Sequence, residues 1–389
     1  MIIRRKFTQI ASALALGGML ASAPAFAQEV VNIGFSGPLS GGAAQYGKNT
    51  LDGLKFAVDE LNATSFEVAG KKVKFEVVAL DDKYNPSETA INFQRLVQQS
   101  KTPVVMCPHS GGSYAIQTSN ERLNALLLSY TSVPKITASG NKLTFRIPPN
   151  FETYIKPFVG YAMKKFGKNL AIANADHDYA KAWTALFKPA WEAAGGKIVA
   201  ENPMSYNKST DFYSGVSKAL ANKPDVLFIG GASEPTGLVA KQARELGFKG
   251  GFIILDQAKL NEMKPIVGSY AALEGAIGVL PVVDDPQPAV KAFVERWMKV
   301  YPGREPGSEA TYNYTAMMVT AGAMKLAGTT SDAMAIRGKL EAAIKALPVA
   351  QNLASYDGID ANGGSLIDTR VAVIDGGKVK EVKLSELAK

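Results

Sequence analysis

Short apolar runs alternate with segments of helical spacing along the first third of the chain. An apolar run covers 30–35, and Leu51, Leu54, Val58 and Leu61 then recur on one face of a helix. The same alternation predicts strands over 73–80, 104–106 and 126–129 and a helix over 88–99. Because crossovers of a dozen or more residues join these strands, the pattern predicts a parallel sheet covered on both faces.

A second copy of this pattern begins after Pro148-Pro149. It predicts helices over 154–166, 181–194, 211–221 and 234–246 and strands over 169–174, 197–201, 225–230 and 251–255. Two Rossmann-like units in tandem indicate an α/β protein whose two lobes enclose a cleft.

The last third of the chain has a different pattern. After Pro281 the spacing predicts three helices, over 288–301, 309–326 and 332–346. A hairpin of 371–375 and 378–382 turns at Gly376-Gly377.

The first 27 residues have the features of a secretory signal peptide. Arg4, Arg5 and Lys6 precede an apolar stretch over 10–20, and Ala25-Phe26-Ala27 fits the small-residue cleavage pattern. No cysteine follows that point to carry a lipid. We therefore expect an exported, periplasmic protein that is not a lipoprotein.

Composition narrows the possible functions. The chain of 389 residues has 47% hydrophobic residues, one cysteine and two histidines, so it predicts a globular protein with no disulfide framework and no structural metal. Removal of the three positive charges of the signal peptide lowers the formal net charge from +8 to +5, and this remaining charge is scattered and forms no basic run, which argues against a nucleic-acid partner. Nothing in the sequence indicates a cofactor, and we expect a monomer.

The sequence contains few groups of residues that could catalyse a reaction. Nucleophilic catalysis needs a base beside its nucleophile, and the candidates are His109 next to Ser110 and His177 within Asp176-His177-Asp178, which the pattern places in a loop. Neighbouring residues on a strand point in opposite directions, so His109 and Ser110 are poorly placed for proton transfer. The paired carboxylates Asp81-Asp82 and Asp284-Asp285 occupy positions typical of solvated charges. The sequence therefore favours a binding protein over an enzyme.

Loops that follow the apolar runs are the places to look for a ligand, because open α/β sheets bind ligands beyond the carboxyl ends of their strands. Ser110 and Gly111 follow one run and lead into a helix, and Thr131 and Ser132 follow the next. Hydroxyl groups and free N–H groups at a helix start suit a carboxylate. Ser110 is also a common type of helix cap, and that alternative stays open.

At this level the sequence resembles a known family. The motifs are Val31-Asn32-Ile33-Gly34, Gly37-Pro38-Leu39-Ser40-Gly41, Gln45-Tyr46-Gly47, Asp59-Glu60-Leu61-Asn62-Ala63 and, later, Gly230-Gly231-Ala232. They resemble the periplasmic leucine/isoleucine/valine-binding proteins, which are type I solute-binding proteins of ABC importers. The resemblance implies two Rossmann-like lobes, a hinge of three segments and a ligand cleft between the lobes.

The resemblance also implies lobe boundaries. Lobe 1 is expected to comprise 28–148 and 281–353, and lobe 2 is expected to comprise 149–280 and 354–389. The crossings fall near 146–150, 278–283 and 351–357.

Site residues follow from the same resemblance. The ligand's α-carboxylate falls on Ser110 and Gly111 and on Thr131 or Ser132. Tyr46 and Tyr179 correspond to the tyrosines that flank the ligand from the two lobes, and Asp256 corresponds to the acid that pairs with its ammonium group. The family usually carries Glu at that place, and it has an aromatic residue where this chain has Ala232. The late tyrosine of the family falls on Tyr312 or Tyr314.

Three functions remain as hypotheses. The first is a binding protein that closes on a small amino acid or related carboxylate and delivers it to an inner-membrane ABC permease. The second is a binder of an aromatic or aliphatic carboxylate or amide without an ammonium group, for which Ala232 leaves room. The third is an exported hydrolase that uses Ser110 and His109.

Overall fold

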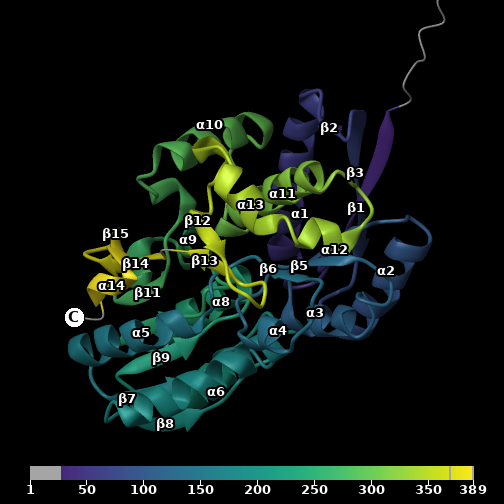
Figure 1. Ribbon diagram of the computed structural model, residues 1–389. Helices are drawn as coiled ribbons and strands as arrows, with labels where there is room; N and C mark the ends of the chain where they lie inside the picture. The colour runs from purple at the N-terminus through teal and green to yellow at the C-terminus, as the bar shows by residue number, and fades with distance from the viewer. Residues whose placement is uncertain (1–27, 368, 388–389) are drawn as a thin grey trace, which may run out of the picture.

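The computed structural model describes residues 28–367 and 369–387, and the expected signal peptide lies outside them. Two separate sheets organise this part of the chain (Figure 1). The first has the strand order β2-β3-β1-β4-β5-β6, and the second has the order β15-β14-β11-β10-β9-β7-β8. Within the described residues, no helix is both long enough and apolar enough to cross a membrane.

The first sheet belongs to lobe 1. Its strands are β1 (Glu29–Gly37), β2 (Glu67–Val68), β3 (Lys71–Asp81), β4 (Val104–Cys107), β5 (Leu126–Ser129) and β6 (Thr144–Arg146). Its early helices are α1 (Ala44–Ala63), α2 (Pro86–Gln98), α3 (Ser110–Gln117) and α4 (Lys135–Ala138). Strands β3, β1, β4, β5 and β6 pair in parallel, as their helical connections require.

Alternate residues of β4 show why the first sheet needs helices on both faces. Val104 and Met106 lie in the core that α1 and α11 cover, whereas Val105 and Cys107 lie in a second cluster beneath α2 and α3. All four side chains are fully buried, as expected for a strand whose successive residues point to opposite faces.

The second sheet forms lobe 2, which is drawn largely in teal beneath lobe 1 in Figure 1. Its strands are β7 (Asn169–Ile172), β8 (Lys197–Glu201), β9 (Val226–Ile229), β10 (Gly251–Ile254), β11 (Ala276–Val279), β14 (Arg370–Asp375) and β15 (Lys378–Lys383). Its helices are α5 (Glu152–Lys165), α6 (Asp178–Ala193), α7 (Tyr213–Leu220), α8 (Ser233–Glu245), α9 (Leu260–Val267) and α14 (Leu384–Leu387), with a 3-10 turn at Tyr270–Leu273. The predicted late hairpin is confirmed: β14 and β15 pair antiparallel and join the sheet through β11.

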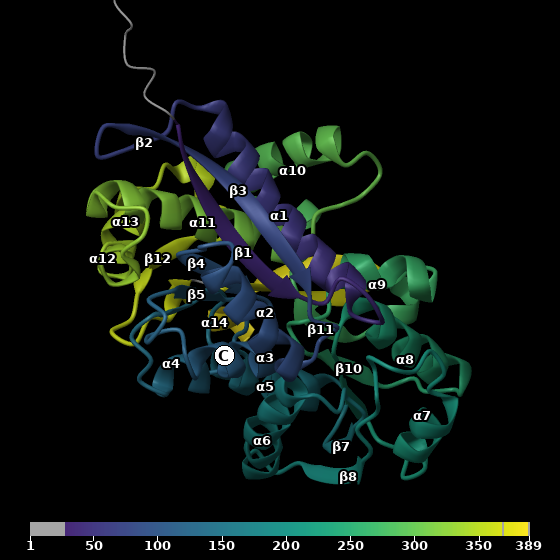
Figure 2. The ribbon, with the colours of Figure 1, turned by 90° about the vertical axis from the view of Figure 1, so that its right-hand side faces the viewer.

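After lobe 2 the chain returns to lobe 1. It forms a 3-10 turn at Val282–Asp284, the helices α10 (Pro288–Val300), α11 (Ser308–Ala327), α12 (Ala333–Arg337) and α13 (Leu340–Ala346), a 3-10 turn at Val349–Gln351, and a hairpin of β12 (Tyr356–Ile359) and β13 (Ser365–Ile367). Figure 2 shows these yellow-green helices in the same lobe as the purple β1 and α1. The prediction of one helix over 332–346 was wrong, because the chain breaks between α12 and α13 at Gly338, a poor helix former.

The chain passes between the two cores three times. Ile147 and Phe151 flank the first passage, Leu280 and Val282 flank the second, and the third lies between Ile359 and Val371. The third passage is later than the expected 351–357. Tyr356 and Ile359 of β12 lie in the lobe 1 core, whereas the expected boundary after 353 assigns them to lobe 2. The sequence pattern does not reveal the β12–β13 hairpin, which holds this segment on lobe 1.

Close packing of α1 on α11 yields a prediction about stability. A Cβ on Gly53 would stand within 3.0 Å of backbone atoms of Ala310, which cannot move aside as a side-chain tip can. We expect Gly53→Ala to lower the free energy of unfolding by about 1–3 kcal/mol in urea titrations. Gly160→Ala is the matched control: this helical glycine of α5 has no atom within 4 Å of its added Cβ, and we expect a gain of up to about 1 kcal/mol. Equal effects of both substitutions would contradict this packing.

Candidate functional site

A cavity lies between the lobes at the carboxyl ends of the central strands. The empty space between its lining residues, open solvent included, is about 300 Å³. Lobe 1 contributes Tyr46 from α1, Tyr84 after β3, Pro108 and His109 after β4, Tyr130, Thr131 and Ser132 after β5, and Pro148 after β6. Lobe 2 contributes Tyr179 from α6 and Asp256, Gln257 and Lys259 after β10. Parallel strands expose such loops at one edge, where ligands of open α/β sheets bind.

The structure brings together most of the residues that the sequence singles out. Tyr46, Thr131, Ser132, Tyr179 and Asp256 all line the cavity. They come from both lobes and from segments up to about two hundred residues apart, so only the fold places them together.

Three other predicted residues do not line the cavity. Ser110 and Gly111 are the first residues of α3, one step beyond His109, and Gly111 faces Pro86 and Asp178. Ala232 precedes α8 and is buried in the lobe 1 core, although it belongs to the chain of lobe 2. Neither of the two late tyrosines lines the cavity. Tyr314 is buried in the lobe 1 core, while the ring of Tyr312 lies 6.0 Å from that of Tyr130.

Asp256 is the charged centre of the cavity. Ser132 of lobe 1 donates a hydrogen bond to its Oδ2 over 2.5 Å, and Tyr179 of lobe 2 donates one to its Oδ1. Trp183 adds a third bond, from Nε1 to Oδ1 over 3.2 Å. Burial, and then the Asp256 charge, raise the pKa of Tyr179 well above its usual value, so the phenol stays protonated and acts as a donor. This carboxylate therefore links the two lobes.

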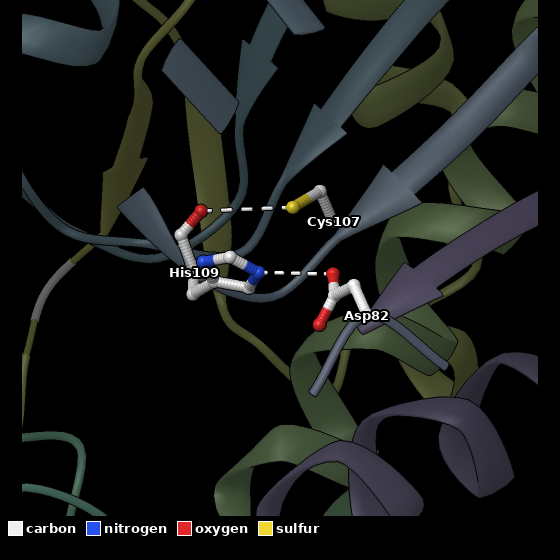
Figure 3. Close-up of side chains that lie close together, drawn as sticks. All are labelled: Asp82, Cys107 and His109. Carbon is white, nitrogen blue, oxygen red and sulfur yellow. Dashed lines mark hydrogen bonds and ion pairs between the residues drawn. The ribbon is translucent and has the colours of Figure 1, made fainter. Parts of the chain in front are cut away.

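Asp82, His109 and Cys107 form a buried cluster behind the cavity (Figure 3). Nδ1 of His109 accepts a hydrogen bond from the Gly112 N–H over 3.0 Å. The ring proton must then sit on Nε2, which donates to Asp82 Oδ2 over 3.0 Å. The Cys107 thiol lies 3.6 Å from the carbonyl oxygen of His109 and donates to it, and burial raises its pKa. Both ring nitrogens are thus engaged, and neither can take a proton from Ser110.

The same cluster has the residue types of a metal site, but its donor atoms already have partners. Asp82 also accepts hydrogen bonds from Ser36 and Thr89 over 3.0 and 2.9 Å. A Cβ on Gly112 would stand within 3.0 Å of both Cys107 Sγ and the His109 ring, so backbone fills the space between them. What the cluster does is hold the imidazole in a fixed orientation at the wall of the cavity.

Two polar atoms at the cavity have no partner. Thr131 Oγ1 and Gln257 Oε1 are buried, both residues line the cavity, and neither atom makes a hydrogen bond. An unpaired buried polar atom costs about 1–3 kcal/mol, so such atoms at a cavity indicate where a ligand binds.

A pair of buried carboxyl groups joins the lobes beside the cavity. A Cβ on Gly307 would stand within 3.0 Å of both Glu262 Oε1, from α9 of lobe 2, and Glu309 Oε2, from α11 of lobe 1. Glu262 accepts hydrogen bonds from Asn49 Nδ2 over 2.6 Å and from Ser233 Oγ over 2.5 Å, whereas neither oxygen of Glu309 has a partner. Burial, and then the proximity of Glu309, raise the pKa of Glu262 to about 8, and burial also raises the pKa of Glu309. The pair therefore holds at least one proton at neutral pH.

Several residues of the cavity are absent from the sequence prediction. Tyr130 and Gln257 directly adjoin the predicted Thr131 and Asp256, so extending each strand-end loop by one residue would have found them. Tyr84 and Lys259 do not directly adjoin a predicted site residue, so the sequence does not mark them in this way. The sequence indicates His109 only as a possible catalytic base, whereas the structure places it in the wall of the cavity.

The family profile and the relatives that match this chain agree on one family of proteins. The family profile described as "Periplasmic binding protein" matches residues 30–373. A Leu/Ile/Val-binding protein of Rhizobium johnstonii is 27% identical over 340 residues, which cover 87% of this chain and 90% of that protein. A leucine-, isoleucine-, valine-, threonine- and alanine-binding protein of Pseudomonas aeruginosa is 24% identical over 294 residues, 75% of this chain and 76% of that protein.

Solved structures share the fold. The substrate-binding protein LivJ of Streptococcus pneumoniae, in complex with isoleucine, has a TM-score of 0.75 at 23% identity and covers 91% of this chain and all of its own. A solute-binding protein of R. palustris in complex with benzoate also has a TM-score of 0.75, at 18% identity, with coverage of 91% of this chain and 96% of that one. The predicted α/β architecture, with parallel sheets and two lobes, is confirmed.

Proposed function

The chain belongs to the periplasmic binding protein family, and from this premise we propose that it captures a small amino acid or related carboxylate between its lobes. The proposal includes delivery of the unaltered ligand to an ABC importer of the branched-chain amino acid type. It also includes export to the periplasm and action as a monomer. Members of the family are substrate-binding proteins and not enzymes.

The observation that carries this proposal is the interlobe cavity, which is lined by Asp256 from lobe 2 and by Thr131, with its unpaired hydroxyl, from lobe 1. A carboxylate pairs with an ammonium group, and a hydroxyl donates to a carboxylate, so the two ends of an amino acid find complementary partners.

Capture requires that the lobes close, and three contacts support this motion. Ser132 bonds Asp256 over 2.5 Å, Tyr84 bonds Gln257 over 2.9 Å, and Asn49 bonds Glu262 over 2.6 Å, each pair spanning the two lobes. Bonds of this kind form only when the lobes meet. A ligand bound to one lobe adds contacts to the other and shifts the population toward the closed form. Closure also excludes water, which strengthens each hydrogen bond to the ligand.

A specific observation also favours the second candidate function. Three protein donors, Ser132, Tyr179 and Trp183, already satisfy the Asp256 carboxylate. The site therefore does not need an ammonium group, and a carboxylate or amide without one stays a candidate ligand. For the hydrolase hypothesis, His109 has both ring nitrogens committed elsewhere.

A thermal-shift panel of the purified protein tests the proposed function. The probes are L-leucine, L-phenylalanine, phenylacetate and acetamide. A ligand that prefers the folded, closed form raises the unfolding midpoint by mass action. We expect an amino acid to raise it, and a panel in which no acid or amide does so would overturn the proposal.

Thr131→Val gives a sharper test of the carboxylate end. The substitution keeps the shape of the side chain and removes the unpaired hydroxyl, so we expect amino-acid affinity to fall at least about tenfold in calorimetry. Ser110→Ala is the comparison, because Ser110 does not line the cavity, and we expect less than about threefold change. The opposite ranking would move the carboxylate site to the start of α3, where the sequence first suggests it.

A further inference from the structure

The walls of the cavity are unusual in composition. Five aromatic rings line it, together with two prolines and a set of polar side chains, and no Leu, Ile, Val, Met or Ala is among the described residues that do so. The rings are those of Tyr46, Tyr84, His109, Tyr130 and Tyr179. A branched aliphatic ligand would meet no aliphatic partner here, whereas a flat ring would meet other rings.

Tyr84 is held in place by its neighbours. Lys83 and Tyr84 both adopt positive φ, 53° and 61°, a conformation that non-glycine residues rarely take. Asp82 stabilises the turn by accepting a hydrogen bond from the Tyr84 N–H over 3.0 Å. The Tyr84 ring then stacks on His109 at 4.6 Å between centroids and lies 5.1 Å from His177 of lobe 2. Strained backbone that the surroundings hold in place is a feature of ligand sites.

Gln257 completes this side of the cavity. Its Nε2 donates to the Tyr84 hydroxyl over 2.9 Å, which fixes the amide and leaves Oε1 buried without a partner. Oε1 is an acceptor, so only a ligand that carries N–H or O–H groups can satisfy it. Gln257 directly follows Asp256, and an ammonium group has three N–H bonds to share between the unpaired Gln257 Oε1 and the Asp256 carboxylate, which can accept further bonds.

We propose, on the basis of the proposed function, that the ligand is an amino acid with an aromatic side chain. Asp256 and Gln257 share its ammonium group, Thr131 binds its carboxylate, and its ring packs against the tyrosine and histidine rings. Tyr84 is then a specificity-determining residue, because its ring forms part of the wall and its hydroxyl orients Gln257.

Calorimetry with three probes tests this inference. L-phenylalanine has both the ring and the ammonium group, L-leucine lacks the ring, and phenylacetate lacks the ammonium group. We expect the wild type to bind L-phenylalanine at least tenfold more tightly than either of the others. In Tyr84→Leu the preference for phenylalanine over leucine should shrink to less than threefold, and in Tyr84→Phe, which keeps the ring, it should survive. Gln257→Leu should weaken phenylalanine at least tenfold and leave phenylacetate unchanged.

Tyr213→Leu replaces an exposed tyrosine of lobe 2 that does not line the cavity, and it should leave all three affinities unchanged. Unfolding midpoints of the free variants show whether any loss comes from misfolding. Tighter binding of leucine than of phenylalanine would overturn this inference and leave the proposed function intact. Binding of phenylacetate alone would show that no ammonium group binds at Asp256 and Gln257 and that the ligand is not an amino acid. No binding of any probe would overturn the proposed function itself.

Discussion

Asp256→Asn is expected to weaken amino-acid binding roughly a hundredfold, about 3 kcal/mol, because Asp256 is the only acid among the described residues of the cavity wall and so the only one whose charge can pair with an ammonium group. Lys259, the other charged residue of the wall, is a cation and bonds the carbonyl oxygens of Asp256 and Gln257. Asparagine keeps the size of the side chain and one acceptor oxygen for Tyr179 and Trp183. The free protein should therefore stay folded, and calorimetry should report the loss as affinity alone.

The control for this experiment is Asp211→Asn. It makes the same change in net charge on the same lobe, at an exposed aspartate that does not line the cavity, and it should change affinity by less than threefold. If Asp256→Asn binds the amino acid as tightly as the wild type, no ammonium group sits at Asp256, and the second candidate function takes its place.

The second large effect is a dependence of closure on pH. Burial and Glu309 raise the pKa of Glu262 from 4.5 to about 8, so the closed form takes up a proton between these values and is favoured at the lower pH. Burial lowers the pKa of His177 from 6.5 to about 4, so the closed form releases a proton between these values and loses stability as pH falls. Lys259 faces the carboxyl pair, with Tyr46 and Tyr130 nearby, and Asp176, His109 and Lys181 surround His177.

Below pH 6.5 the titrations of Glu262 and His177 change the stability of the closed form in opposite directions. Above pH 6.5 only the Glu262–Glu309 carboxyl pair changes it. Affinity should therefore be nearly flat from about pH 4.5 to 6.5 and should fall by up to about tenfold per pH unit from 6.5 to 8. Calorimetry across this range measures the curve. Glu262→Gln, which cannot ionise, should remove most of the fall, and Glu295→Gln, an exposed acid of α10, should leave it unchanged. A wild-type affinity that is level to pH 8 would show that the pair holds no proton on closure.

Much of the fold could be predicted from local pattern. The run 197–201 is a strand with those bounds, and the segment 88–99 is the helix α2, because their apolar spacing matches one secondary structure and not the other. The prediction of a single helix over 332–346 was wrong, because the apolar spacing continues across Gly338 whereas the helical backbone stops there. The β12–β13 hairpin is short and its strands are only partly apolar, so periodicity carried too little signal.

The candidate site could be predicted only in part, for a different reason. Thr131 and Asp256 follow strands, and strand ends can be located from local pattern. Tyr84 reaches the cavity through a left-handed turn, and its partner Gln257 lies 173 residues away. Glu262 and Glu309 meet across the lobe interface from two separate helices. Contacts of this kind depend on how the lobes pack, which no local spacing encodes.

Mass spectrometry of the bound solute tests the central claim most directly. The purified protein is dialysed to equilibrium with L-phenylalanine, freed of unbound solute and denatured. The mass and the amount of the released molecule are then measured. The account predicts one molecule per chain with its mass unchanged, and near-complete loss of it in Thr131→Trp, whose larger side chain fills the cavity. A released product of different mass, or full occupancy in Thr131→Trp, would contradict capture of an unaltered ligand between the lobes.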